Sequence, residues 1–345
     1  MAKFQALPWL VGLWKRLPPA STWATDLSGK TVLITGANVG LGLETAKHLA
    51  RLRPEKLILA CRDLQKAEAA KALIVQECGV EEGTVLCWEL DQAKFESVRA
   101  FVGRFEREGG GRLDLLIANA GISTAKYAKT SDGWEQTLQV NHLSTSLLVL
   151  LLLPHLLAAP LSPPTPRVVL LTSEMHLQIA DIREPAEGTI LEALNGEESI
   201  YQAIEMLAMQ SFLRYGVSKL LNLAFARALG AHLPSTTPLT VNAVNPSSTQ
   251  SSLQRELGTC GPWLLQKMFF RRTEMGSRTI VHAALGMDAQ GVQGAYLNDC
   301  AVAECSDFLL SEKGVKVQEQ LWNETIDVLR KFDPKVLQIV KGYLS

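Results

Sequence analysis

From residue 30 onward, short apolar runs alternate with longer stretches that have the spacing of amphipathic helices. The apolar runs predict strands at Thr31–Thr35, Lys56–Ala60, Thr84–Glu89, Leu113–Ala118, Arg167–Thr172, Leu239–Asn245 and Gly294–Leu297. The stretches between them predict helices at Leu41–Arg51, Leu64–Glu77, Phe95–Glu108, Gly133–Leu157 and Phe212–Ala231. Several strands are almost wholly apolar, as is typical of a parallel sheet covered on both faces. The sequence therefore predicts a doubly wound α/β fold with about seven parallel strands and ligands bound at their carboxyl ends.

The alternation forms one block, and no second alternating block follows it. Domains of this class run to about 250 residues or more as one unit, so residues 27–335 are predicted to form a single domain. Residues 1–26 precede it as an apolar N-terminal extension, and residues 336–345 follow it as a C-terminal tail.

A glycine-rich turn separates the first predicted strand from the first predicted helix. Thr35-Gly36 ends the strand, and Gly40 and Gly42 open the helix in a TGxxxGxG spacing. Glycines let such a turn bend tightly and bring backbone N–H groups close to a pyrophosphate at the helix N-terminus. In this strand–turn–helix setting the cluster predicts a nucleotide site rather than a plain turn.

The residues that follow the second predicted strand, Ala60-Cys61-Arg62-Asp63, bear on which dinucleotide binds. NAD-binding folds place a carboxylate near this strand end, where it accepts hydrogen bonds from the ribose 2′-hydroxyl. Here the strand-end residue is Cys61, and the guanidinium of Arg62 suits a 2′-phosphate. The carboxylate of Asp63 would instead suit the 2′-hydroxyl of NAD(H), unless Asp63 caps the following helix. The pattern favours NADP(H) over NAD(H).

Tyr215 and Lys219, in the segment Tyr-Gly-Val-Ser-Lys, are four residues apart in a predicted helix. At this spacing both side chains lie on one face and can contact the same ligand. A phenol with a pKa of about 10 is a poor acid–base catalyst at neutral pH, and a neighbouring ammonium favours its ionised form. With Ser173 upstream, the pair predicts a proton-transfer site that faces a nicotinamide pocket.

Charge and cysteine content exclude some classes of partner. A net charge of −1 and a pI near 6.6 provide no electrostatic footprint for nucleic acid. The six cysteines form no CxxC pair, so we expect reduced thiols, no metal site and a cytoplasmic protein.

Two apolar segments leave alternatives open. Residues 4–14 are too short to span a bilayer and are followed by Lys15 and Arg16. They either pack on the protein's own surface or make a peripheral membrane contact through residues 4–16. The run Leu147–Leu157 predicts a helix buried against the sheet or against a partner subunit.

Together the motifs resemble those of the short-chain dehydrogenase/reductase family, above all its retinol dehydrogenase-like and WW-domain oxidoreductase-like members, many of them fungal. The motifs occur in the family's order over about residues 27–330: TGANVGLG at 35–42, ACRD at 60–63, Asp91, Asn119-Ala120-Gly121, Val140-Asn141-His142, Ser173 in LLTSEMH, YGVSK at 215–219 and Val244-Asn245-Pro246. The resemblance implies a Rossmann fold and a nicotinamide-dependent oxidoreductase.

The resemblance also implies a role for each matching residue. Tyr215 would transfer the proton, Ser173 would hydrogen-bond the substrate oxygen, and Lys219 would hold the nicotinamide ribose and lower the pKa of Tyr215. Asn141 would hold a water that links Lys219 to solvent, or would only cap or bridge within its helix. Asp91 would contact the adenine edge, or would cap the next segment. The other cofactor-binding positions are Gly36, Asn38, Gly40, Leu41, Gly42, Arg62, Asn119, Gly121, Pro246 and Ser248.

Three segments depart from the family pattern. The gap between Ser173 and Tyr215 is long, so residues 178–211 form an insertion that we expect to lie as a loop or short helices over the pocket rim. Ser247 stands where the family usually has glycine, which could alter the backbone beside the nicotinamide. Residues 249–272 predict a mobile substrate lid or a fixed amphipathic helix. His176 follows the catalytic serine and is expected to pack or hydrogen-bond rather than to exchange protons.

These features predict an NADP(H)-dependent oxidoreductase that interconverts a carbonyl and an alcohol on a hydrophobic small molecule. A polyketide-, terpenoid- or retinoid-like substrate fits an apolar lid, as in a ketoreductase of secondary metabolism. The alternatives are a non-redox enzyme of this fold, which cyclises or isomerises its substrate, and a cofactor-binding scaffold without turnover. Relatives often dimerise through the helix that bears YxxxK and the one before it, so a homodimer is left open.

Overall fold

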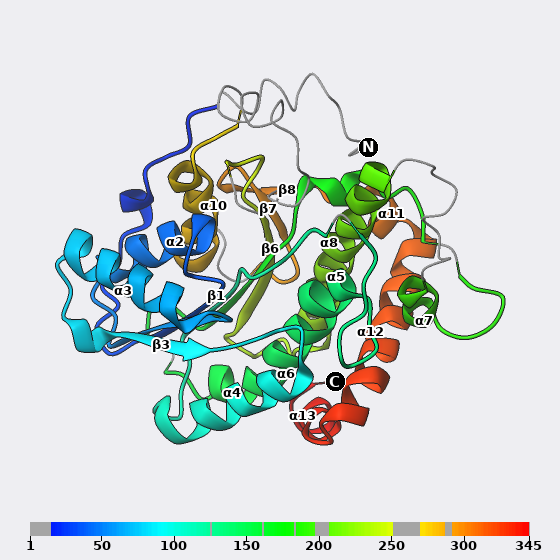
Figure 1. Ribbon diagram of the computed structural model, residues 1–345, viewed down its shortest axis with the longest axis horizontal. Helices are drawn as coiled ribbons and strands as arrows, with labels where there is room; N and C mark the ends of the chain where they lie inside the picture. The colour runs from blue at the N-terminus through cyan, green and yellow to red at the C-terminus, as the bar shows by residue number, and fades with distance from the viewer. Residues whose placement is uncertain are drawn as a thin grey trace.

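The computed structural model describes residues 15–344 except 125, 161, 183, 197–206, 251–269 and 287–291, and the side chains of 207–211 are also not described. Its strands are β1 (Thr31–Thr35), β2 (Lys56–Cys61), β3 (Val85–Glu89), β4 (Leu115–Ala118), β5 (Arg167–Leu171), β6 (Thr240–Asn245), β7 (Tyr296–Asn298) and β8 (Ala301–Ala303). They form one sheet in the order β3-β2-β1-β4-β5-β6-β7-β8 (Figure 1).

The sheet confirms the predicted doubly wound topology. Strands β1 to β7 pair in parallel, and the chain reverses direction across the sheet between β3 and β4, beside β1. The expectation of about seven parallel strands misses only β8, which pairs antiparallel with β7 at the edge. With three residues, two of them exposed, β8 has no apolar run that sequence periodicity could reveal.

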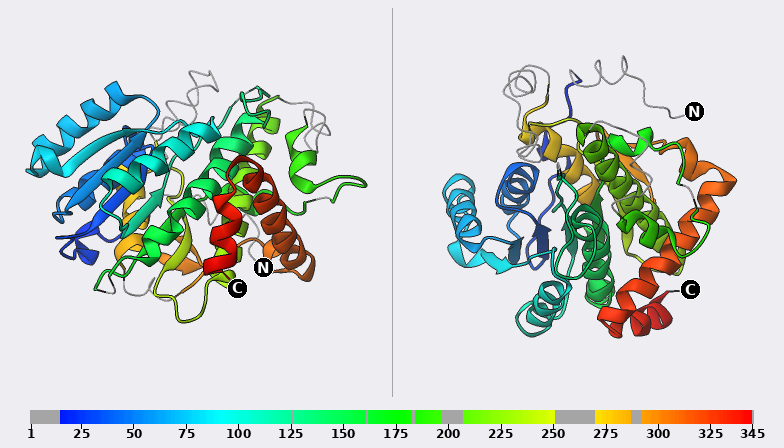
Figure 2. Two further views of the ribbon diagram at one scale, coloured as in Figure 1. Left: turned by 90° about the horizontal axis from the view of Figure 1, so that it is seen from below. Right: turned by 45° about the vertical axis from the view of Figure 1, so that its right-hand side comes forward.

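Helices cover both faces of the sheet (Figure 2). One face carries α2 (Gly40–Ala50), α3 (Leu64–Cys78) and α10 (Thr273–Leu285), and the other carries α4 (Phe95–Glu108), α6 (Ser144–Leu157) and α8 (Leu207–His232). The remaining helical elements are η1 (Ala20–Trp23), η2 (Glu82–Thr84), α5 (Gln136–Leu138), η3 (Gln139–Leu143), η4 (Glu174–Gln178), α7 (Ile190–Asn195), α11 (Asp307–Leu310), α12 (Glu312–Phe332) and α13 (Lys335–Tyr343).

Alternation along the strands divides the interior into two hydrophobic cores. In β1, Leu33 packs into the core under α4, α6 and α8, whereas Val32 and Ile34 pack into the core under α2 and α10. All three side chains are fully buried, because successive strand residues point to opposite faces. This two-sided burial explains why the predicted strands are apolar throughout.

The C-terminal helices α12 and α13 complete the second core from within the same chain. Helix α12 packs on α8, and α13 packs on α6. Trp322 of α12 stacks on Phe225 of α8 at 5.6 Å between ring centroids, and Val336 of α13 is fully buried. Residues 336–343, which the sequence pattern assigns to a C-terminal tail, therefore belong to a helix that packs on the core.

The apolar run at 147–157 lies inside this arrangement. Residues Gln136–Leu157 have the length and apolarity of a membrane-spanning helix, yet 83% of their most apolar window is buried in the protein. Helix α6 is enclosed by the sheet, α4 and α13. The run was predicted to be buried either against the sheet or against a partner subunit, and in the described residues it is buried against the sheet and helices of its own chain.

The N-terminal segment before β1 lies along α10. Trp23 of η1 contacts the ring of His282 at 4.9 Å between centroids, and Arg278 donates a hydrogen bond to the carbonyl oxygen of Leu17 at 2.9 Å. Leu17 and Leu27 are buried. Residues 1–14, which contain the apolar segment 4–14, lie outside the described residues.

The first half of the 178–211 insertion is held against the rest of the fold. Glu324 of α12 accepts hydrogen bonds from the backbone N–H groups of Ile190 and Leu191 at 3.1 and 2.9 Å, at the start of α7. At the other end of α7, the Asn195 side chain bonds the backbone of Gly133 and Glu135. Helix α7 therefore packs on α12 instead of forming a free loop.

The segment that sequence analysis assigns to a lid, 249–272, is described only at its ends. There Thr249 and Arg271 form a parallel bridge, and Gln250 N–H donates to the carbonyl oxygen of Arg271 at 2.9 Å. Residues 251–269 lie outside the described residues, so the choice between a lid and a fixed helix stays a prediction.

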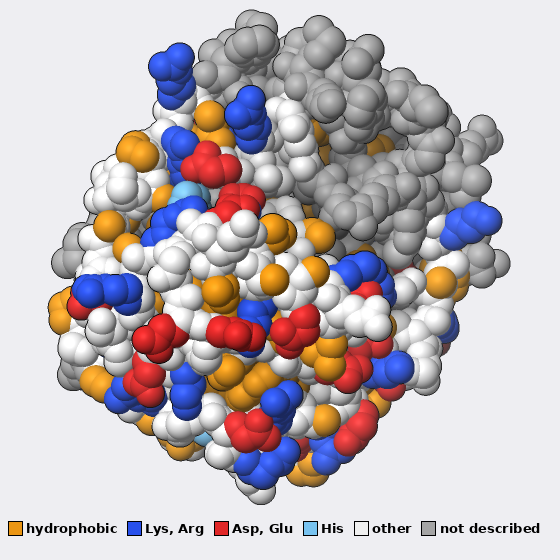
Figure 3. Space-filling view, turned by 60° about the vertical axis from the view of Figure 1, so that its left-hand side comes forward, with side chains coloured by type: hydrophobic (Ala, Val, Ile, Leu, Met, Phe, Trp, Pro, Cys, Tyr) orange, Lys and Arg blue, Asp and Glu red, His pale blue; other side chains and the backbone are white. Residues whose placement is uncertain are grey.

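The described surface mixes charges of both signs. On the face shown in Figure 3, basic and acidic side chains lie interspersed. Exposed ion pairs of the described residues include Arg104 with Glu108 and Arg330 with Asp327. Exposed pairs of this kind contribute little stability, typically about 0–1 kcal/mol each.

Candidate active site

The glycine-rich turn has the geometry that its sequence predicts. Gly36 and Gly40 have positive φ angles of 65° and 62°, which only glycine adopts readily. A Cβ on Gly42 would lie 2.4 Å from the carbonyl oxygen of Gly36, so no other residue fits. Asn119 fixes the turn from the neighbouring strand, since its Nδ2 donates to the carbonyl oxygens of Thr35 and Gly36 at 2.8 and 3.1 Å.

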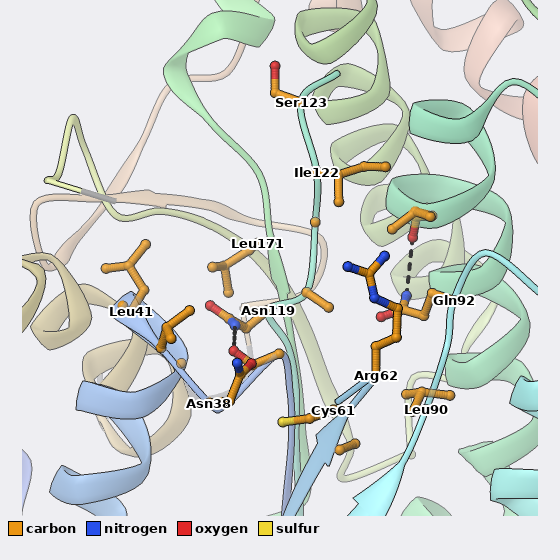
Figure 4. Close-up of a pocket in the computed structure, with 18 of the residues that line it drawn as sticks. Asn38, Leu41, Cys61, Arg62, Leu90, Gln92, Asn119, Ile122, Ser123 and Leu171 are labelled. Carbon is orange, nitrogen blue, oxygen red and sulfur yellow. Dashed lines mark hydrogen bonds between the residues drawn. The ribbon is translucent and has the colours of Figure 1, made fainter. Parts of the chain in front are cut away.

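A cavity of about 430 Å³ opens at the carboxyl ends of the strands, above this turn (Figure 4). It runs from the ends of β2 and β3 to the start of α8. Its lining includes nearly all of the predicted cofactor positions: Gly36, Asn38, Gly40, Leu41, Gly42, Arg62, Asp91, Asn119, Gly121, Pro246, Tyr215 and Lys219. The crowded glycines and the N-terminus of α2 form a cradle for a pyrophosphate, so these residues fit a dinucleotide.

The adjacent residues Arg62 and Asp63 have different surroundings at one end of the cavity. Arg62 lines it and is exposed there, and among the described residues no carboxylate pairs with its guanidinium. Asp63 caps α3 instead, accepting from Lys66 N–H at 3.1 Å and pairing with the Lys66 ammonium at 2.8 Å. The interpretation of Asp63 as a helix cap agrees with this geometry.

Asp91 takes part in a turn and also borders the cavity. Its Oδ1 accepts from Ala93 N–H at 3.1 Å, and its Oδ2 lies 3.8 Å from the ammonium of Lys94. The geometry is thus compatible with both roles predicted for Asp91, capping of the next segment and contact with the cofactor.

Tyr215 and Lys219 line the other end of the cavity, and Ser173 lies within hydrogen-bond distance of Tyr215. Burial raises the pKa of Tyr215 above its ordinary value, the Ser173 hydroxyl lowers it through a hydrogen bond, and the Glu174 carboxylate raises it further. Burial also lowers the pKa of Lys219 to about 8. Lys219 Nζ donates to the carbonyl oxygen of Leu171 at 3.0 Å and lies 5.5 Å from the Tyr215 ring centroid.

The net shift of the Tyr215 pKa is upward, and burial is its largest cause. Tyr215 is therefore protonated at neutral pH, the form that can donate a proton. The Lys219 ammonium donates to the carbonyl oxygen of Leu171 at the end of β5, and the predicted lowering of the Tyr215 pKa by Lys219 stays a prediction.

Asn141 lies in a π-helical turn, η3, and its side chain is fully used. Its Oδ1 accepts from Ile122 N–H at 2.8 Å, and its Nδ2 donates to the carbonyl oxygen of Ile122 and to Ser218 Oγ, both at 2.9 Å. The side chain thus bridges the cavity wall to the helix of Tyr215. Its role in a proton relay stays a prediction.

Gly121 separates Asn141 from Lys219. A Cβ at this position would lie 3.2 Å from Asn141 Oδ1 and 3.3 Å from Lys219 Nζ. Glycine at this position therefore avoids crowding the polar groups of both residues.

The loop after β6 differs from expectation at Ser248. Pro246 lines the cavity, but Ser248 does not, because its hydroxyl donates to Glu174 Oε1 at 2.7 Å. The serine at 247 has a φ of 63°, which explains why a glycine would suit this position. An Asn245 side-chain oxygen supports the turn by accepting from Ser247 N–H at 3.0 Å.

His176 contacts the backbone of Ser173. Its Nδ1 lies 2.6 Å from the carbonyl oxygen of Ser173, and its ring meets Tyr296 edge-on at 4.7 Å between centroids. Burial lowers the pKa of His176 to about 4, so the ring is neutral at physiological pH. This agrees with a packing and hydrogen-bonding role.

Sequence reasoning missed several polar residues that hold the site together. Thr172 donates to the backbone oxygen of Lys219 at 2.7 Å, and Asn222 donates to that of Leu171 at 3.2 Å. Gln92 is buried beside the cavity and reaches the η3 turn. The only sequence signal for Thr172 and Gln92 is a position next to a motif, and Asn222 lies three residues after Lys219, outside every motif.

A parallel sheet whose glycine-lined cavity ends at a serine, a tyrosine and a lysine defines a class, the nicotinamide-dependent oxidoreductases. Comparisons with known proteins agree. Residues 30–178 match the family described as short chain dehydrogenase. The short chain dehydrogenase/reductase dmxR8 of Cryptosporiopsis sp. (strain 8999) is 34% identical over 328 residues, or 94% of this chain and 97% of that protein.

Two further similarities come from animals. Retinol dehydrogenase 12 of Mus musculus is 37% identical over 309 residues, or 89% of each chain. The crystal structure of NADPH-bound carbonyl reductase from chicken fatty liver shares the fold, with a TM-score of 0.56 at 22% identity over 79% of this chain and 97% of that one. The chain belongs to the short-chain dehydrogenase/reductase family, whose members bind a nicotinamide cofactor and act on CH–OH and C=O groups.

Proposed function

We propose that this protein is an NADP(H)-dependent oxidoreductase that interconverts a carbonyl and an alcohol on a hydrophobic small molecule. One observation carries the proposal: Tyr215, hydrogen-bonded to Ser173, and Lys219 line one end of a dinucleotide-sized cavity whose other end presents Arg62. The bound cofactor would supply the hydride. The protein's own residues handle the proton and the substrate oxygen.

The preference for NADP(H) rests on the two residues after β2. Arg62 offers the cavity a guanidinium with which no carboxylate of the described residues pairs, whereas Asp63 is committed to Lys66 and to the cap of α3. A guanidinium can bind a 2′-phosphate through two parallel hydrogen bonds. Cys61, the strand-end residue, cannot replace the carboxylate that selects a 2′-hydroxyl, because burial raises the pKa of its thiol to about 11.

For reduction, Tyr215 is the proton donor and Ser173 orients the substrate. The two hydroxyls are hydrogen-bonded to each other. A carbonyl oxygen that replaces this bond would accept a hydrogen bond from each of them. The two donors stabilise the negative charge that develops on this oxygen, and Tyr215 then releases its proton to it. Lys219 is held by Leu171 and Thr172, which fixes its position below the tyrosine.

A hydrophobic substrate is supported by the walls around this pair. Ile122, Leu171 and Val140 line the cavity at its catalytic end, and the similar mouse protein is named for retinol. We also propose peripheral membrane contact through residues 4–16, since Lys15 and Arg16 are exposed after an apolar, tryptophan-bearing segment. Flotation with liposomes, with and without residues 2–14, tests that contact.

The test of the catalytic role compares the wild type with Tyr215→Phe. NADPH consumption is followed by absorbance with all-trans-retinal, a bicyclic ketone and an aryl ketone as probes, and NADPH affinity is measured separately by calorimetry. We expect the wild type to reduce at least one probe. Tyr215→Phe should lower kcat by about 10²- to 10⁴-fold while NADPH affinity changes by less than about threefold.

Tyr127→Phe is the matched control. It removes the same hydroxyl from a tyrosine that bonds the carbonyl oxygen of Asn195 and does not line the cavity, so turnover should persist. If the wild type binds NADPH but consumes none with any probe, the redox assignment fails and the non-redox and scaffold alternatives take precedence.

A further inference from the structure

Gln92 is a buried polar residue that contacts two functional regions at once. It follows Asp91 at the end of β3, lines the cavity near Arg62 and is 6% exposed (Figure 4). Its Nε2 donates to the carbonyl oxygen of Val140 at 3.1 Å and to Thr145 Oγ1 at 2.9 Å. Nothing in the chemistry derived above requires an amide at this position.

The target of these hydrogen bonds is the irregular part of the helix that carries Asn141. In η3 the N–H of Ser144 donates to Gln139, five residues back, instead of to Val140 as in an α-helix. The carbonyl oxygen of Val140 therefore accepts from side chains, Gln92 Nε2 at 3.1 Å and Thr145 Oγ1 at 3.2 Å. Such donors are needed because an unpaired buried carbonyl destabilises the conformation that exposes it.

The π-turn determines where Asn141 points. An inserted turn rotates the following side chains relative to a regular helix, and here Asn141 reaches both Ile122 and Ser218. Ser218 lies between Tyr215 and Lys219 on α8. Gln92 thus acts on the catalytic end of the cavity through Val140 and Asn141, without touching it.

The other atom of the amide faces the cavity. With Nε2 occupied by two acceptors, the orientation of the amide is fixed and Oε1 is its remaining polar atom. Among the described residues no donor contacts Oε1, and this oxygen is not sealed in the interior. It therefore presents an acceptor at the Arg62 end of the cavity, where the amine of an adenine ring is the complementary donor.

We propose that Gln92 selects the adenine ring through Oε1 and positions the Asn141 turn through Nε2. The inference deepens the proposed function, because it assumes that the cavity binds NADPH. It makes Gln92 a positioning residue for catalysis and a direct contact for the base. One amide then links occupancy of the adenine end to the geometry of the catalytic end.

The binding arm of the test uses NADPH and its hypoxanthine analogue, in which the adenine amine is replaced by oxygen. Calorimetry gives both affinities for the wild type, Gln92→Met and Thr145→Val. The wild type should prefer NADPH by about 3- to 10-fold, the worth of one neutral hydrogen bond. Gln92→Met should lose that preference. Thr145→Val should keep it, since Thr145 does not line the cavity.

The catalytic arm uses the carbonyl probe that the wild type reduces best, at saturating NADPH. Either single variant leaves Val140 one donor, so each should lower kcat by less than about tenfold, with little change in KM for the probe. Gln92→Met/Thr145→Val leaves no side-chain donor, so its loss in kcat should exceed the product of the two single losses. A purely structural role would instead lower thermal stability and leave kcat and base preference intact.

The outcomes separate this inference from the proposed function. If the wild type binds NADPH and Gln92→Met keeps the full preference over the hypoxanthine analogue, the adenine contact is wrong. If the double variant keeps wild-type kcat, the positioning role is wrong. If the wild type binds neither nucleotide, the proposed function itself fails and the inference fails with it. Should Gln92→Met not fold, the preference for NADPH over the hypoxanthine analogue is compared in Thr145→Val and Asp91→Asn. Loss of that preference in Asp91→Asn would assign the adenine amine to Asp91 and would contradict the Gln92 contact.

Discussion

At the scale of single residues, Ser247 has a left-handed backbone conformation that glycine adopts most readily. The family's glycine allows a positive φ after the proline, and Ser247 adopts a φ of 63° despite its side chain. Asn245 holds the turn by accepting the Ser247 N–H. The substitution therefore introduces local strain, while the path of the loop beside Pro246 is kept.

Replacing Ser247 by glycine should stabilise the protein. A non-glycine residue in the left-handed region costs about 1–2 kcal/mol, and part of the gain is offset by the larger entropy of glycine in the unfolded chain. We expect the free energy of unfolding in urea to rise by about 0.5–1 kcal/mol. A variant less stable than the wild type would show that the serine side chain contributes a favourable contact.

The buried ammonium of Lys219 makes stability depend on pH. Its pKa is about 8 in the folded protein without cofactor, below the ordinary 10.5, because burial disfavours the charge. Between these two values the unfolded chain binds more protons than the folded one, so stability rises with pH over this window. Below pH 8 both states are protonated, and the contribution no longer changes.

The measurement is the difference between the wild type and Lys219→Met in urea unfolding at pH 7.5 and 9.5. From pH 8 to pH 9.5 the wild type should gain about 2 kcal/mol relative to the variant, at about 1.4 kcal/mol per pH unit. A difference that stays constant with pH would mean that Lys219 titrates near its ordinary value.

At the scale of elements, α7 depends on a carboxylate from α12. Glu324 satisfies the backbone N–H groups of Ile190 and Leu191 and is 8% exposed. Negative charge at a helix N-terminus is favourable, and two unpaired buried donors are not. Helix α7 is therefore attached to α12 through its N-terminus.

Glu324→Ala should release this attachment. We expect a loss of about 1–3 kcal/mol in stability, with hydrogen exchange accelerated first in the amides of α7. Glu319→Ala on the same helix is the control, because Glu319 is half-exposed and its ion pair among the described residues is with His232 at the surface. Its effect should stay within about 0.5 kcal/mol. Equal effects of the two substitutions would contradict the capping role.

The sheet strands up to β7 and the helices up to α8 could largely be predicted from the sequence, for local reasons, whereas α10, α12 and α13 were not predicted. Strand β1 and helix α4 were predicted with their observed bounds, because apolar period and turn residues lie within each element. Gly42 and Tyr215 were found because their spacing is fixed by a turn and by a helix. Arg62 was distinguished from Asp63 by strand position alone.

The remaining features depend on contacts between distant parts of the chain. The π-turn η3 is stabilised by Gln92, 48 positions away in the sequence, and no local pattern predicts it. The same holds for the Ser248 hydroxyl, which was expected at the cofactor but bonds Glu174. The upward shift in the Tyr215 pKa follows from burial, which helical spacing does not reveal.

At the scale of the whole molecule, α12 packs on α8 and α13 packs on α6, the two helices that the family resemblance assigns to a dimer interface. Trp322 and Val336 are buried there. We therefore expect a monomer of 37.7 kDa by light scattering coupled to size-exclusion chromatography. Twice that mass, independent of concentration, would show that the chain associates through another surface.

The identity of the cavity as an NADP(H) site underlies the proposed chemistry, and calorimetric titration with NADPH and with NADH tests it most directly. Arg62→Gln is compared with Lys66→Gln, which removes a nearby charge that does not line the cavity. We predict that the wild type and Lys66→Gln bind NADPH at least about tenfold more tightly than NADH, a difference of about 1.4 kcal/mol, and that Arg62→Gln loses this preference. Tighter binding of NADH, or no binding of either by the folded protein, would contradict the assignment.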